Sequence, residues 1–123
     1  MRQERRNNRS YNVQEALELQ LAETARRGSF SSVMLAENQG IPVAAAGNIA
    51  ANEEICALAP SLVPGKRLWK GKIAIDNGPE KFVTIAPVKT EIGNLYLCGV
   101  GGDSSKVIAE LLNTTHGINR ILA

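Results

Sequence analysis

Apolar residues recur at every fourth position near the start of the chain, and four of them form one stripe: Val13, Leu17, Leu21 and Ala25. This spacing places them on one face of an amphipathic α-helix. Asn12 is suited to cap the helix because its side chain can accept a hydrogen bond from a free backbone amide. Gly28 is a natural terminator. The pattern therefore predicts a helix over residues 13–27.

Short apolar runs follow this helix. Residues 30–36 and 41–46 are typical of two strands, and the polar segment 37–40, which ends in a glycine, makes a hairpin between them. Pro42 has no amide hydrogen to donate, so the second of these strands is expected at a sheet edge.

A second helical stretch begins at Asn52, where Glu53 and Glu54 occupy the first turn and complement the helix dipole. Pro60 removes a helical hydrogen bond, so this helix should be short or kinked just before the proline. Pro64-Gly65 ends the region. The apolar stripe of this helix contains Ile55, Leu58, Ala59 and Leu62.

From residue 67 the period changes to two: Trp69, Ile73 and Ile75 alternate with Lys70 and Lys72. This alternation predicts a strand with one buried and one solvated face, and its lysines suit a sheet edge. Trp69 is either a core residue or an anchor on a dimer surface, where tryptophan is enriched. Such an edge strand could pair with its symmetry mate.

Two further strands are predicted over residues 82–88 and 95–100, separated by a turn at 91–94. A turn at Asp76-Asn77-Gly78-Pro79 precedes them. The strand at 95–100 is the most apolar, so it should be central. With the strand that carries Trp69, these two strands form an antiparallel meander.

The last helix has an apolar face made of Val107, Ile108, Leu111 and Leu112. Asp103 or Ser104 can cap it, and Gly117 is a candidate end that leaves 118–123 as a tail or a further turn. The element order is therefore α-β-β-α-β-β-β-α, which predicts an α+β fold.

Composition adds the domain limits. The chain has 123 residues and a net charge of +2, which suits one domain and makes nucleic acid an unlikely partner. Basic charge gathers at the front, and residues 1–11 have little to bury, so we expect a flexible basic tail before a domain over 12–123. No apolar run is long enough to cross a bilayer.

Candidate chemistry is sparse. Cys56 and Cys98 lie in mostly apolar stretches and should be buried free thiols, consistent with a reducing cytoplasm. His116 is the single histidine, so no metal site is expected, and a surface or capping role is favoured for it. Glu53 and Glu54 are adjacent on a helix and diverge, so they do not form a facing acid pair.

The segment 99–106 follows a strand and opens a helix, which is the context of a phosphate-binding loop. Its spacing fails, because Ser104 and Ser105 stand where such a loop needs glycine and lysine. Asp103 would also repel an anion. A glycine turn that leads into a helix cap is the better interpretation.

These elements together resemble the roadblock/dynein light chain family, within the profilin-like and longin-like group, over roughly residues 13–120. The resemblance rests on the first helix, the strand 33–36, the turn with Gly40, and the segments 41–46, 52–59 and 95–100. It implies a five-stranded antiparallel sheet with the second helix on one face and the other two helices on the opposite face. It also implies no catalytic residues, no cofactor and no metal.

Family members dimerise through the second helix and the third strand, which correspond to residues 53–62 and 68–75. Pro60 and Pro64 depart from the family pattern by shortening that helix. The resemblance predicts a dimer interface made of Glu54, Ile55, Leu58, Leu62, Leu68, Trp69, Ile73 and Ile75.

The resemblance implies a non-enzymatic, dimeric scaffold or regulator of a small Ras-like GTPase, or of another cytoplasmic complex. An arginine finger from Arg67 or from the basic tail is a further option. Two alternatives stay open: a small-ligand sensor, and an accessory subunit of an enzyme whose site lies mostly in another chain.

Overall fold

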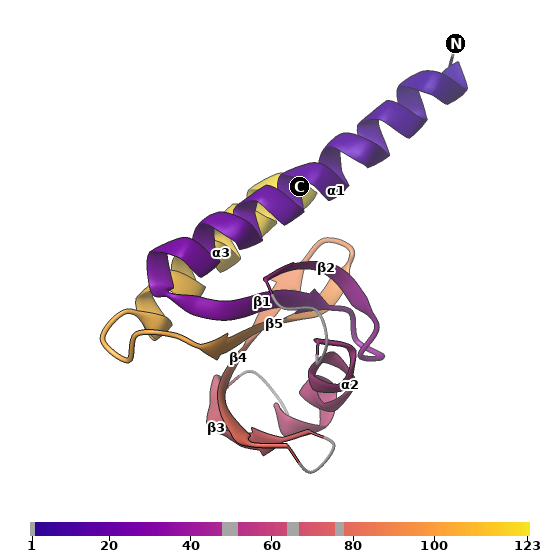
Figure 1. Ribbon diagram of the computed structural model, residues 1–123. Coiled ribbons are helices and arrows are strands. Elements are labelled where there is room, and N and C mark those ends of the chain that lie inside the picture. Colours follow the sequence, from indigo (N-terminus) through magenta and orange to yellow (C-terminus); the bar gives the residue numbers. More distant parts are fainter. Residues whose placement is uncertain (1, 48–51, 64–66, 76–77) are drawn as a thin grey trace.

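A computed structural model describes residues 2–47, 52–63, 67–75 and 78–123. The predicted turns at Pro64-Gly65 and Asp76-Asn77 lie outside these residues. The predicted α+β element order is confirmed (Figure 1): α1 (Arg2–Gly28), β1 (Phe30–Ala36), β2 (Pro42–Gly47), α2 (Asn52–Leu62), β3 (Trp69–Ala74), β4 (Glu80–Thr90), β5 (Gly93–Gly101) and α3 (Val107–Leu122).

The five strands form one antiparallel sheet in the order β2-β1-β5-β4-β3. The most apolar strand, β5, is central as predicted, and β2 and β3 form the two edges. The β2 edge is blunted twice. Pro42 offers no amide donor, and the Gln14 side chain of α1 donates to the carbonyl of Val43 at 2.9 Å.

The sheet separates two apolar cores. Helices α1 and α3 cover one face and α2 covers the other, as Figure 1 shows. The core under α1 and α3, called the first core, includes Leu17, Leu21, Leu35, Leu97 and Leu111. The core under α2, called the second core, includes Met34, Ile55, Ile85, Cys98 and Val100. No helix in the described ranges is both long and apolar enough to cross a membrane.

Helix α1 begins at Arg2, so the predicted start at Asn12 is wrong. Arginine, glutamine and glutamate, which dominate the first six residues, are strong helix formers, and they extend the helix towards the N-terminus. Figure 1 shows this part of α1 projecting past the sheet. Its separation from the domain at residue 12 stays a prediction.

Helix α3 also differs from its predicted limits. It begins at Val107, because the Asp103 carboxylate caps the preceding turn instead, accepting hydrogen bonds from the amide and hydroxyl of Ser105. These bonds lower the pKa of Asp103. The helix continues through Gly117, where a Cβ would lie 2.5 Å from the Gln20 side chain. Gly117 therefore permits close packing of α3 on α1 and does not end the helix.

Helix α2 is short, as predicted, and contains Pro60. The hairpin between β1 and β2 presses against this helix. A Cβ on Gly40 would lie 2.8 Å from the Cα of Ala57 and 2.9 Å from the carbonyl oxygen of Cys56. Gly40 also has a φ of 84°, so glycine is required there by both conformation and contact.

Candidate protein-interaction surface

The polar surroundings of His116 do not form a catalytic arrangement. The residue is exposed at an open hollow between α1 and α3. Within that hollow, Glu23 is bound to Arg26 and Arg27, and the Arg26 guanidinium lowers the pKa of Glu23. The hydroxyls of Thr24 and Thr114 are buried and hydrogen-bonded to each other. Neither is therefore exposed as a nucleophile beside an imidazole base.

The glycines of segment 99–106 serve packing. A Cβ on Gly99 would lie 2.7 Å from the Phe30 ring, and one on Gly102 would lie 2.8 Å from it. Gly28 contacts the same ring from the end of α1. The predicted glycine turn is present, since Gly101 and Gly102 have positive φ, but no side chain caps α3 after it. Gly99 and Gly102 also make room for an aromatic side chain at the junction of α1, β1 and β5.

Cys56 and Cys98 are free and buried, as predicted, and they meet in the second core. The neighbouring Cys56 thiol and burial together raise the pKa of Cys98 well above its ordinary value. No group of three or more His, Cys, Asp and Glu residues within the described ranges is placed to hold a metal ion.

The predicted interface residues of α2 divide between two environments. Glu54 is exposed, Leu58 is 41% exposed and Leu62 is half-buried. Ile55, in contrast, is 1% exposed and packs in the second core of its own chain. Ile55 therefore supports the outer face of α2 from beneath.

The residues of β3 alternate as predicted. Trp69, Ile73 and Ile75 are half-buried and pack against the second core, on the same face of the sheet as α2. The Trp69 ring covers Gly71, where a Cβ would lie 2.6 Å from it. Leu68 packs against the first core, so it does not share the face of the other interface residues.

Helix α2 packs mainly on β1, β2 and β5. The apolar face of β3 packs against the same second core as α2, and Figure 1 shows α2 inside the curve of the sheet with β3 at the far edge. We define the α2–β3 surface as Glu54, Leu58, Leu62, Trp69, Ile73 and Ile75.

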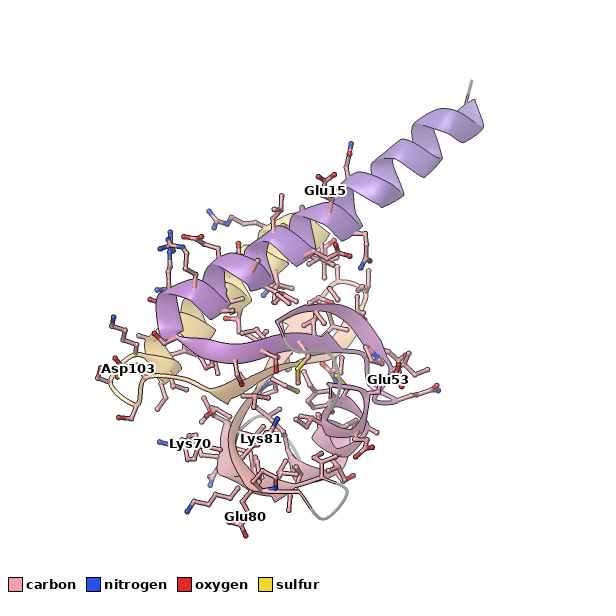
Figure 2. All side chains as sticks on the ribbon, in the orientation of Figure 1. Glu15, Glu53, Lys70, Glu80, Lys81 and Asp103 are labelled. Atoms are coloured by element: carbon pink, nitrogen blue, oxygen red, sulfur yellow. The ribbon has the colours of Figure 1, made fainter. Side chains whose placement is uncertain are left out.

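Sequence reasoning missed one member of this face. Lys81 lies directly across from Ile73 in the β3–β4 register, and Figure 2 shows it on the side of the sheet that faces α2. The alternation along β4 could have predicted this position, because Val83 and Ile85 enter the second core. Lys81 is two residues before Val83, so it lies on the same face of the strand and adds positive charge to a largely apolar surface.

No protein-family model matches the sequence, and no curated protein sequence matches it either. Solved structures do match. The gliding protein MglB from Thermus thermophilus is 14% identical, with a TM-score of 0.67 over 89% of this chain and 90% of that chain. A Roadblock/LC7 domain from Streptomyces avermitilis is 13% identical, with a TM-score of 0.64 over 85% and 96% of the two chains. The chain has the roadblock/LC7 fold.

A further MglB, solved with a tetrameric arrangement, is 16% identical and has a TM-score of 0.67 over 89% of this chain and 90% of that chain. The roadblock/LC7 fold agrees with the resemblance drawn from the sequence. At these identities the likeness establishes the architecture, and function has to be argued from the surfaces of this chain.

Proposed function

We propose that this chain is a non-enzymatic, dimeric roadblock/LC7 module that scaffolds or regulates a small Ras-like GTPase in the cytoplasm. The α2–β3 surface carries the proposal. It combines exposed and half-buried apolar residues on α2 with the apolar face of β3. It also adjoins a sheet edge, because β3 pairs with β4 on one side and is the last strand in the sheet order.

A dimer with its two-fold axis beside β3 would bury this surface. Antiparallel pairing of two β3 edges joins two sheets and supplies hydrogen bonds to backbone groups that the monomer leaves to water. Both copies of α2 would then lie on the same side of the joined sheet, with Leu58 and Trp69 between them. The tetrameric arrangement of one MglB with the same fold supports assembly as a property of this architecture.

A module of this kind would act on a GTPase by placing the GTPase's own residues. The roadblock resemblance suggests this partner. Arg67 is exposed just before β3 and is the candidate arginine finger if the chain supplies one.

The dimer is tested by Ile73→Glu. A carboxylate on this side chain would be desolvated in the interface, so the variant should be a monomer by light scattering where the parent chain is a dimer. Ile92→Glu, at an exposed residue in the β4–β5 turn, is the control and should remain a dimer. A parent chain that stays monomeric at high concentration would exclude the dimer.

The partner is tested by binding to purified small GTPases of the Ras superfamily, each loaded with GDP or with a non-hydrolysable GTP analogue. We expect one of them to bind in a nucleotide-dependent way, and Ile73→Glu to weaken that binding. Binding that ignores the nucleotide in every case, or no binding across the panel, would contradict the GTPase role and leave the dimer unaffected.

A further inference from the structure

A second apolar surface lies on the opposite face of the sheet from α2. Helix α3 packs on β4 and β5 and leaves β3 uncovered on this face. Three large apolar side chains remain exposed along the resulting groove: Phe82 (42%), Ile108 (41%) and Leu112 (50%). Exposed groups of this kind, gathered in one place, mark interaction sites more often than scattered ones do.

The register of β3 and β4 shows how the groove is built. Lys72 lies across from Phe82, and Lys70 lies across from Thr84. Both lysines are exposed. Figure 2 shows Lys70 outside the sheet, on the side away from α2. Helix α3 forms one wall, β4 the floor and β3 the basic outer wall. We define the α3 seam as Lys70, Lys72, Phe82, Ile108 and Leu112.

Two hollows mark the ends of this groove. One, of about 70 Å³, is lined by Lys70, Phe82 and Ile108 together with the turn before α3. The other, of about 290 Å³, lies between Thr115 and Asn119 of α3 and the end of β4. From Ile108 to Asn119 the helix rises by roughly 17 Å, or about three turns.

Beneath the groove, β4 contains an unsatisfied polar group. Thr84 is fully buried, and its hydroxyl has no hydrogen-bond partner among the described residues. Thr84 shares the face of its neighbours Phe82 and Ala86 by alternation along β4. Buried hydroxyls are normally paired, so this one marks a place where the packing of the isolated chain is incomplete.

The rim of the groove is positively charged. Lys70, Lys72 and Lys106 are exposed, and none forms a salt bridge to another residue in the described ranges. Two carboxylates are near. Asp103 is held by Ser105, and Glu80 lies across from Ala74, beyond the end of the seam. An apolar row bordered by exposed lysines is complementary to an acidic amphipathic segment.

We propose that the α3 seam binds a short, acidic amphipathic helix of a partner protein. The apolar face of the helix would cover Phe82, Ile108 and Leu112, and its carboxylates would meet Lys70 and Lys72. This is helix-in-groove recognition, and the groove length suits about three turns. The side chains of the α3 seam and those of the α2–β3 surface lie on opposite faces of the sheet, although both surfaces include β3.

An anionic membrane is the competing occupant. Membrane-binding clusters usually contain roughly four to eight basic residues on a convex or flat surface. The rim has three lysines, Lys70, Lys72 and Lys106, around a groove, which favours a peptide.

The test is selection of random peptides of about twelve residues on the full chain, with counter-selection on Leu112→Glu. The selected pool should be rich in Asp and Glu, with apolar residues three or four positions apart. Lys70→Glu with Lys72→Glu should weaken the best peptide by roughly tenfold or more, because each reversed charge turns an attraction into a repulsion.

Three controls make the result specific. Arg120→Glu reverses a charge on another side of α3, Ile92→Glu alters an exposed apolar residue elsewhere, and Leu58→Glu alters the α2–β3 surface. Each should leave peptide binding unchanged. The proposal fails if the pool shows no acidic excess, or if the controls weaken binding as much as the lysine variants do. It also fails if the chain selects no peptide but sediments with vesicles of phosphatidylcholine and phosphatidylserine.

Discussion

Thr84 is the residue whose position departs most from ordinary packing. It lies in the central part of β4, is inaccessible to solvent and carries a hydroxyl without a hydrogen-bond partner in the part of the chain that the structure describes. Two other buried threonines, Thr24 and Thr114, have partners: their hydroxyls lie within hydrogen-bond distance of each other and of carbonyl oxygens in their own helices. The contrast isolates the energetic cost of one unpaired hydroxyl.

Thr84→Val should therefore stabilise the chain. Valine has nearly the same shape and no hydroxyl to leave unpaired, so the free energy of unfolding should rise by about 1 kcal/mol. Thr114→Val is the matched control. It removes a satisfied hydroxyl and should lower stability by about 1 kcal/mol. Urea denaturation followed by circular dichroism measures both, and a destabilised Thr84→Val would contradict the assignment.

The two thiols give a second prediction. Because Cys56 and Cys98 are buried, neither should react with Ellman's reagent in the folded chain, and both should react in urea. The hydrogen bond between the two thiols lowers the pKa of Cys56 and, together with burial, raises the pKa of Cys98 well above its ordinary value. The larger shift is that of Cys98, and the unfolded chain loses this proton first as pH rises. The free energy of unfolding should then fall above about pH 8.5. Cys98→Ala should flatten that decline. Rapid labelling of the folded chain would refute the burial.

At the scale of elements, the contact between the β1–β2 hairpin and α2 depends on Gly40. Gly40→Ala should destabilise the fold by about 2–4 kcal/mol, since the methyl group meets rigid backbone and the positive φ is strained. Gly93→Ala separates the two causes. Gly93 also has a positive φ, but nothing lies within 4 Å of its added Cβ, so its cost should be about 1 kcal/mol. Thermal and urea unfolding measure the stability of both variants. If Gly40→Ala and Gly93→Ala lose the same free energy of unfolding, the contact with α2 has no role in the cost.

The sequence predicted the element order, the central β5 and both edge strands, because strand periodicity, Pro42 and the lysines of β3 are local signals. The predicted helix ends are wrong where another effect outweighs the local capping or terminating signal. Asn12 could cap a helix, yet the helix-forming residues before it continue α1. Gly117 could end one, yet it is needed for contact with Gln20. That contact joins distant parts of the chain and leaves no local mark.

The candidate site could likewise be predicted only where local sequence patterns determine it. The shared face of Trp69, Ile73 and Ile75 followed from alternation along one strand. The inward direction of Ile55 did not, because α2 carries apolar residues on more than one side. The α3 seam required the register between β3 and β4 and the packing of α3, which only the assembled sheet provides.

At the scale of the whole molecule, α1 projects past the sheet on which it packs (Figure 1). Among the side chains that the structure describes, Val13 and Leu17 are the first in α1 to pack in the first core. Removing residues 1–11 should therefore change the melting temperature by less than about 3 °C, although helical circular dichroism should decrease. Leu17→Ala, which opens a hole in the first core, should lower it by roughly 10 °C or more. A comparable loss on truncation would show that the tail is part of the domain.

The unequal treatment of the two sheet edges limits how far association can go. A sheet with two open edges can add copies at both ends and grow into a fibre. Here Pro42 and the Gln14 side chain close the β2 edge. Pairing through β3 would therefore use the one sheet edge that is left, and strand addition would stop at two copies.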